Sequence, residues 1–98
     1  MLYTLYNIDK AGTDIRTTHR PEHRAYLARY AEQIAFAGPL LGADGTTPAG
    51  SLLVMEFASP GDVDAFIADE PYAVAGLYAS ISVRPFVNLW PQKAGFPA

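Results

Sequence analysis

The chain has 98 residues, of which 50% are hydrophobic, 17% are charged and none is cysteine. A chain of this length has room for one core, and its composition predicts a folded domain without disulfides, thiolate metal sites or a catalytic thiol. Ten acidic residues outweigh seven basic ones, for a net charge of −3, which argues against a nucleic-acid partner held by phosphate contacts.

The start of the chain has no basic leader followed by an apolar run, and no segment reaches the ~18 uncharged apolar residues that cross a bilayer. We therefore expect a cytoplasmic protein with no membrane partner, in which residues 1–98 form a single domain. An apolar fraction of one half is generous for so small an interior, so part of that surface is expected to face a partner.

The first third of the chain predicts a strand, a loop and a helix. Residues 2–8 carry β-branched, aromatic and Leu side chains on both alternating faces, which indicates a central strand covered on both sides. Residues 9–18 show no periodicity and predict a loop. Pro21 suits the first turn of a helix. Spacings of four, three and four then place one inward stripe on that helix: His23, Leu27, Tyr30 and Ile34.

The middle of the chain predicts two strands joined by a loop. Residues 36–41 are short and apolar with an internal Gly-Pro, which is typical of an edge strand or a bend. Residues 42–50, rich in Gly, Asp, Thr and Pro, predict a turn or loop. Residues 51–57 are apolar on both alternating faces and predict a second covered strand.

A second helix and a last strand complete the pattern. Ser59 can cap a helix, and Pro71 ends that helix or tightens it into a following turn. Residues 79–88 predict the last strand, with Pro85 pushing its far end to a sheet edge. Residues 89–98 predict an irregular, apolar tail.

This order of strand, helix, strand, strand, helix, strand is the α+β, ferredoxin-like βαββαβ pattern, with both helices on one face of an antiparallel sheet. The strands are apolar on both faces, so the face away from the helices predicts a homodimer in which two sheets pack against each other. The alternative is a monomer in which some of these positions are half-exposed Tyr and Thr.

The basic residues are concentrated near the first helix. No Lys or Arg occurs between residues 30 and 83, whereas five of the seven cations lie between positions 10 and 29: Lys10, Arg16, Arg20, Arg24 and Arg29. If this helix lines a pocket, its entrance is positive and favours a small anionic ligand, with Arg20 and Arg24 as contacts. The alternative is a solvated helix face with ion pairs to Glu22 and Glu32.

His23 is the best candidate for a catalytic group. It shares the inward stripe of the first helix, and a partly buried imidazole there is suited to general-base work near neutral pH. The alternative is a core histidine satisfied by one hydrogen bond. Pro21 leaves His19 outside the helix, so the two histidines do not predict a metal site.

Two adjacent acids at the end of the second helix are candidate partners of His23. Glu70 lies seven residues after Val63 and continues the inward stripe, whereas Asp69 points to one side. A carboxylate bonded to one ring nitrogen fixes the tautomer and raises the basicity of the other nitrogen. The alternative is a carboxylate that points to water. Three further residues are candidate hydroxyl contributors, each with a structural alternative: Ser51, Tyr72 and Tyr78.

Five short motifs in the same order resemble those of the YciI-like family, and the likeness runs from residue 2 to about residue 87. The motifs are Arg20-Pro21-Glu22-His23, Ala37-Gly38-Pro39-Leu40, Gly50-Ser51 before a strand ending in Glu56-Phe57, Asp69-Glu70-Pro71-Tyr72 followed by Ala75-Gly76-Leu77-Tyr78, and Ser82-Val83-Arg84-Pro85-Phe86. The resemblance implies a dimeric α+β barrel related in architecture to muconolactone isomerase, with an active site built on a His-Asp pair.

The resemblance places the family's histidine at His23 and its aspartate at Glu70, with Asp69 one residue earlier. This difference leaves open whether Glu70 replaces the aspartate, whether Asp69 takes its place, or whether the pair is impaired. One branch of the family looks like a dehydrochlorinase acting on a chlorinated hydroxyhydroquinone in aromatic degradation.

We therefore expect an acid-base lyase or isomerase that needs no cofactor or metal and acts on a small anionic, aromatic or lactone-like molecule. Its catalytic residues are His23 with Glu70 or Asp69, and the substrate-binding candidates are Arg20, Arg24, Ser51 and Tyr72. The alternative is a ligand-binding or accessory domain without chemistry. A His23 nitrogen bonded to a carboxylate beside a cavity favours the enzyme.

Overall fold

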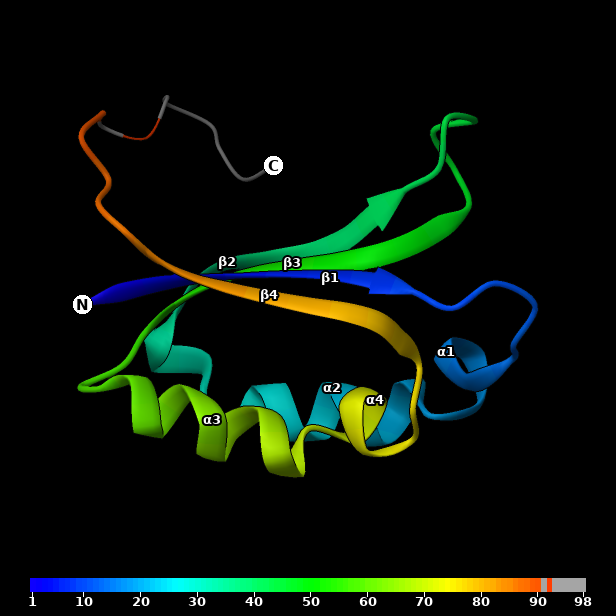
Figure 1. Cartoon of the computed structure of the whole chain (residues 1–98), viewed down its shortest axis with the longest axis horizontal. Coiled ribbons are helices and arrows are strands. Elements are labelled where there is room, and N and C mark those ends of the chain that lie inside the picture. The colour runs from blue at the N-terminus through cyan, green and yellow to red at the C-terminus, as the bar shows by residue number, and fades with distance from the viewer. Residues whose placement is uncertain (91, 93–98) are drawn as a thin grey trace.

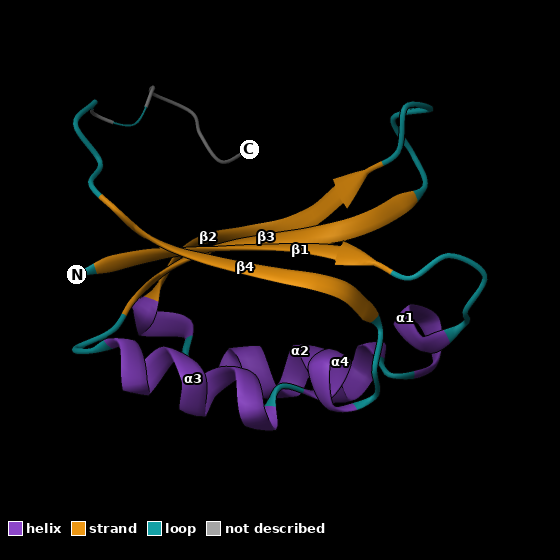
Figure 2. Ribbon diagram, viewed as in Figure 1, coloured by secondary structure: helices purple, strands orange, loops and turns teal. Residues whose placement is uncertain are grey.

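The computed structural model describes residues 1–90 and 92, which form an antiparallel sheet with helices on one of its faces (Figures 1 and 2). The strands follow the order β2-β3-β1-β4 across the sheet. Their bounds are Leu2–Asp9 for β1, Ile34–Leu41 for β2, Pro48–Glu56 for β3 and Tyr78–Phe86 for β4. The helices are α1 (Ile15–Thr18), α2 (Arg20–Ala28), α3 (Pro60–Asp69) and α4 (Pro71–Val74), with a 3₁₀ turn at Ala31–Gln33.

This arrangement confirms the predicted α+β, ferredoxin-like fold. Residues 2–9 form a central strand, as expected, and the Gly-Pro strand β2 lies at one edge. The helix that Ser59 was expected to cap is α3, because the Ser59 hydroxyl accepts the backbone N–H of Asp62 at 3.2 Å. Pro71 does not only end this helix, because it also starts the short helix α4.

The core lies between the sheet and helices α2 and α3. The cluster joins strand residues to helix residues, and its buried members include Leu5 at 1% exposure and Phe66 at 2%. Truncating a buried aromatic residue to Ala in such a core costs about 3–5 kcal/mol of stability. The other buried members are Tyr3, Tyr26, Leu53, Met55, Phe57 and Val63.

The first helix ends earlier than its apolar stripe predicts. Helix α2 stops at Ala28, and Ile34 is the first residue of β2, where it pairs with Met55. Leu27, Tyr30 and Ile34 still pack against the core, because a 3₁₀ turn carries the chain back toward the sheet. The interpretation of Ile34 as helical was therefore wrong, although its inward direction was right.

Two segments that were predicted as loops contain helix or strand residues. The 9–18 segment contains α1, and β3 begins at Pro48 within the 42–50 segment. Gly50 pairs with Ile8 in the sheet, and a Cβ atom there would collide with the backbone oxygen of Asn7. A glycine in this strand therefore marks a close backbone approach rather than a turn.

The tail predicted for residues 89–98 is irregular at Leu89 and Trp90, while residues 91 and 93–98 lie outside the described residues. After β4 the chain turns to the side of the sheet away from the helices (Figure 1). Within residues 1–90, no helix is long and apolar enough to span a membrane.

Candidate active site

The carboxylate of Glu70 is buried at the junction of α3 and α4. Helix α3 ends at Asp69, and Glu70 adopts an extended backbone (φ −70°, ψ 122°), which turns its side chain into the protein. Oε1 accepts the N–H of Tyr72 at 3.2 Å and Oε2 accepts the N–H of Ala73 at 3.0 Å, so Glu70 caps α4. The inward direction expected for Glu70 is present, but it comes from this turn and not from a continued helical stripe.

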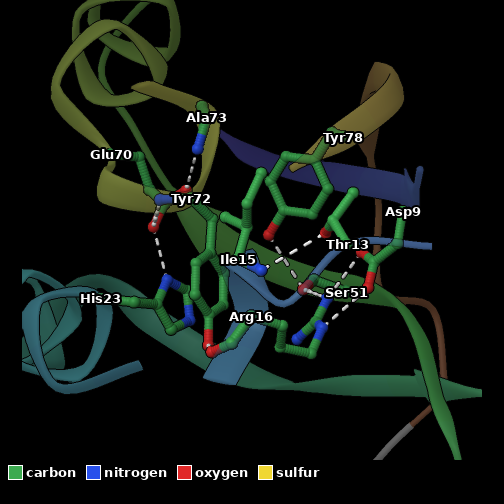
Figure 3. A network of polar contacts seen from close by, with 10 residues as sticks. All are labelled: Asp9, Thr13, Ile15, Arg16, His23, Ser51, Glu70, Tyr72, Ala73 and Tyr78. Carbon is green, nitrogen blue, oxygen red and sulfur yellow. Dashed lines mark hydrogen bonds and ion pairs between the residues drawn. The ribbon is translucent and has the colours of Figure 1, made fainter. Parts of the chain in front are cut away.

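His23, in the second half of the first turn of α2, meets Glu70 directly. Its Nδ1 is hydrogen-bonded to Oε1 of Glu70, and its side chain is 13% exposed (Figure 3). The imidazole also stacks on the ring of Tyr72, with centroids 3.9 Å apart and planes inclined by 12°. Because the Glu70 oxygens already accept two backbone N–H groups, Nδ1–H of His23 is the donor in this contact. The structure thus brings Glu70 to His23, whereas Asp69 is exposed.

Arg16, from helix α1, is the third charged residue brought into this region. Its Nε and Nη2 bind the two carboxylate oxygens of Asp9 at 2.8 and 2.7 Å, and Nη2 also donates to Oγ of Ser51 at 3.0 Å. Burial opposes its charge, but the hydrogen bond and charge of Asp9 outweigh this and raise the pKa of Arg16. Among the described residues, Nη1 has no hydrogen-bond partner, so two N–H donors remain for a ligand.

Tyr72 lies between His23 and Arg16 (Figure 3). Its hydroxyl donates to the backbone carbonyl of Arg16 at 2.8 Å, and the Arg16 guanidinium lies over its ring at 5.0 Å. Burial raises the pKa of Tyr72, while the charges of Arg16 and Arg20 lower it in part. The ring of Tyr72 therefore contacts both the candidate base, His23, and the guanidinium of Arg16, and it fixes their relative positions.

Ser51 and Tyr78 form a buried hydroxyl pair beside Arg16. Their oxygens are 3.0 Å apart, and Ser51 is 4% exposed. Burial raises the pKa of Tyr78, the hydrogen bond of Ser51 lowers it, and the charge of Glu70 raises it. The net direction is upward, so Tyr78 is a neutral hydroxyl across the physiological range.

These groups open on a cavity of about 370 Å³, a volume suited to a small molecule. Its lining includes all four predicted substrate-binding residues, Arg20, Arg24, Ser51 and Tyr72. Arg16 and His23 line it as well. The apolar part of the lining consists of Leu27, Leu53, Ala37, Gly38, Pro39 and Pro48. Such a lining suits a small ligand with an apolar body and oxygen substituents.

Sequence reasoning did not single out Arg16 and Asp9 as site residues. Arg16 was counted among the basic residues, but its segment was interpreted as a loop, so it had no predicted position. A usable signal was present in Thr13-Asp14 before Ile15, because short polar side chains there are typical of a helix start. Thr13 does accept the N–H of Ile15 at 3.3 Å.

The histidines do not form a metal centre in the described part of the chain. Nδ1 of His19 lies 3.5 Å from Oε2 of Glu22, and the two side chains are 41% and 61% exposed. Across residues 1–90 and 92, no group of three His, Cys, Asp or Glu residues is placed to hold a metal ion.

The fold and the site define a class: a ferredoxin-like protein with a buried histidine-carboxylate pair beside a ligand-sized cavity. Within it, this chain belongs to the YCII-related domain family, whose model matches residues 1–87. It is 35% identical to Protein YciI of Escherichia coli O6:H1 and of Shigella flexneri, covering 92% of this chain and 100% of each relative.

The chain is also similar to a solved enzyme structure, 5-chloro-2-hydroxyhydroquinone dehydrochlorinase (TftG) from Burkholderia phenoliruptrix AC1100 in complex with 2,5-dihydroxybenzoquinone. The TM-score is 0.84 at 34% sequence identity, and the match covers 89% of this chain and 94% of that one. That enzyme thus combines the same fold with an oxygen-rich quinone ligand.

Proposed function

We propose that this protein is a cofactor-independent acid-base enzyme, a lyase or isomerase, that acts on a small oxygenated aromatic molecule. The observation that carries the proposal is the contact between His23 Nδ1 and the buried carboxylate of Glu70 beside a 370 Å³ cavity. Glu70 takes the place that the family resemblance gives to an aspartate, and its capping bonds fix its position. Asp69, exposed at the helix end, has no part in the proposed pair.

In this proposal His23 is the general base. With Nδ1–H donated to Glu70, the lone pair of Nε2 is the proton acceptor, and the nearby negative charge stabilises the imidazolium that forms. Nε2 has no hydrogen-bond partner among the described residues. Stacking on Tyr72 restricts the ring, so the acceptor is oriented before the ligand arrives.

The arginines are the proposed contacts for ligand oxygens. Arg16 is paired with Asp9, so it offers directed N–H donors rather than uncompensated charge. Arg20 and Arg24 are exposed at the same cavity and supply the positive charge that attracts an anion such as a phenolate or carboxylate. Ser51 and Tyr72 complete the proposed ligand contacts.

Dehydrochlorination of a chlorinated hydroxyhydroquinone is the first reaction to test, because the similar structure is that of such an enzyme. Loss of HCl from a chlorinated trihydroxybenzene leaves a hydroxyquinone. One hydroxyl proton moves to the chlorine-bearing ring carbon as the ring takes its keto form. A second hydroxyl proton then goes to His23, and chloride leaves with the electron pair of the C–Cl bond. The balance requires neither an oxidant nor a reductant, so a base and a polar cavity are sufficient.

We further propose that the protein is a homodimer, formed through the sheet face away from the helices. That face exposes Tyr6 (46%) and Phe36 (48%), together with Ile8 and Phe86. A hollow of about 550 Å³ on the same side is lined by β2 residues, Leu52, Val54 and Trp90. Exposed aromatic and aliphatic side chains at this density are typical of an interface between protein chains.

The proposal is tested by incubating the purified protein with hydroxylated and chlorinated aromatics without added cofactor, while recording chloride release and ultraviolet spectra. Turnover of at least one chlorinated polyhydroxybenzene is expected. A protein that binds these compounds and returns all of them unchanged would instead be a ligand-binding domain, the alternative that the sequence left open.

A further inference from the structure

Within residues 1–90 and 92, one buried side-chain oxygen has no hydrogen-bond partner: Oδ1 of Asn7. Asn7 is 4% exposed and lies on β1, paired with Ser51 of β3 and Ile81 of β4, on the sheet face that meets the helices. Leaving a buried acceptor unpaired costs free energy, so such groups normally bind protein or ordered water. We therefore expect a hydrogen-bond partner for Oδ1 of Asn7.

Asn7 lines a second, small cavity, which is distinct from the larger pocket. It has about 10 Å³ open to the centre of a water molecule, which is room for one water. His23 and Leu53 contribute to the walls of both cavities. The polar part of the small cavity consists of Asn7, His23, Glu70 and Tyr78, and the remainder is apolar: Leu5, Leu53, Phe66, Ile67, Ala73 and Ile81.

The direction of the hydrogen bonds around Tyr78 provides a second, independent observation. Arg16 has no acceptor atom, so its Nη2 must donate to Ser51. The Ser51 and Tyr78 hydroxyls share one further bond in which either oxygen can be the donor, so one of their two protons has no acceptor among the described residues. When Ser51 is the donor, the remaining proton is that of Tyr78. Tyr78 and Asn7 both line the small cavity, and the side chain of Asn7 interacts with Tyr78, because it lowers the pKa of Tyr78 in part.

Glu70 supplies a further acceptor at this cavity. Oε2 accepts one bond, from the N–H of Ala73, and a carboxylate oxygen can accept a second. With Ser51 as the donor to Tyr78, the residues that line the cavity offer one donor, at Tyr78, and two acceptors, at Asn7 and Glu70. One water molecule, which accepts one bond and donates two, satisfies all three.

We propose that this cavity is a binding site for one internal water molecule, held by Asn7 and joining Tyr78 to Glu70. The water completes a directed chain of donors that runs from Arg16 through Ser51 and Tyr78 to Glu70, where His23 donates from the other side. The functional consequence rests on the proposed function: both ends of this chain lie at the ligand cavity, at Arg16 and at His23. The water therefore positions the Glu70 carboxylate for its contact with the base.

The test is a crystal structure of the ligand-free wild-type protein at about 1.2 Å, with water-to-amide NMR transfer measured on the side-chain NH₂ of Asn7. We expect one density peak within hydrogen-bond distance of Asn7, Glu70 and Tyr78, and a cross-peak from bound water to the Asn7 amide. Asn7→Leu should remove the density peak, and the cross-peak is compared only between variants that keep the Asn7 amide. Tyr78→Phe, which keeps both acceptors but loses the donor, should weaken the cross-peak.

A dry cavity in the wild-type crystal, or an Asn7 amide turned so that its oxygen meets a protein donor, would overturn the inference. Because the water is sought in wild-type protein without ligand, that result leaves the proposed reaction untouched. Conversely, a water in place with no turnover of any aromatic compound would count against the reaction alone.

Discussion

The carboxylate of Glu70 binds His23 with the same oxygen, Oε1, that accepts the backbone N–H of Tyr72. The histidine is therefore tied to the cap of helix α4 and not to a freely rotating side chain. The first turn of that helix also supplies the ring, Tyr72, on which the imidazole stacks. A local turn of a few residues thus builds both the electrostatic and the steric support of the base.

Glu70→Gln should lower turnover by roughly 10²-fold or more, because the amide no longer stabilises an imidazolium. The variant keeps one cap acceptor, so it should remain folded by circular dichroism. Asp69→Asn is the matched control, because that carboxylate is exposed, and it should retain wild-type rates. Equal losses in both variants would contradict the assignment of Glu70 as the partner of His23.

Arg16→Lys should weaken binding of 2,5-dihydroxybenzoquinone about tenfold in calorimetry, since hydrogen bonds to charged groups contribute about 1.5–3 kcal/mol. Lysine keeps a positive charge near Asp9, but it lacks the planar fork that reaches Asp9, Ser51 and a ligand together. Arg29→Lys is the control, because Arg29 lies over Tyr26 and not at the cavity. Unchanged affinity in Arg16→Lys would remove Arg16 from the proposed ligand contacts.

Tyr78→Phe should reduce the amount by which the free energy of unfolding falls at alkaline pH. The pKa of Tyr78 is raised in the folded state, so above the ordinary Tyr value near 10 the unfolded chain releases a proton that the native protein retains. The contribution of Tyr78 to the free energy of unfolding is therefore fully present below that pH and is lost as the pH rises toward the folded pKa. Urea unfolding between pH 8 and 11 measures the free energy of unfolding. Equal slopes of this free energy against pH in wild type and variant would contradict the prediction.

Tyr6→Arg should shift the protein toward the monomer, because it places a charge in the proposed sheet-to-sheet interface. Light scattering after size exclusion should give twice the 10.6 kDa chain mass for the wild type. Val74→Arg is the control, since Val74 is equally available at 68% exposure but lies on helix α4. A wild-type protein that stays monomeric at micromolar concentration would reject the interface.

The sequence predicted the element order and the direction of the main site residues, because apolar periodicity and capping signals act over a few residues. Ile34 shows the limit of periodicity, since a residue can continue a helical stripe in sequence and yet start a strand that packs on the same core. Glu70 was placed inward by helix geometry, but its real position depends on an extended residue between two helices.

Arg16 could not be placed from the sequence for a different reason. Its partners Asp9 and Ser51 lie 7 and 35 residues away, and the sheet register that brings them together is a tertiary property. The same holds for Asn7, whose burial follows from its pairing with Ser51 and Ile81. Polar contacts between distant strands leave no periodic trace along the chain.

The most direct test of acid-base catalysis by His23 is the turnover rate of wild type, His23→Ala and His19→Ala with the best substrate from the aromatic screen. His19 is the control because it is the other histidine, and it is paired with Glu22 at the surface. We predict that His23→Ala abolishes turnover while keeping a native circular dichroism spectrum, and that His19→Ala retains the wild-type rate. Matched rates for wild type and folded His23→Ala would contradict acid-base catalysis at this site.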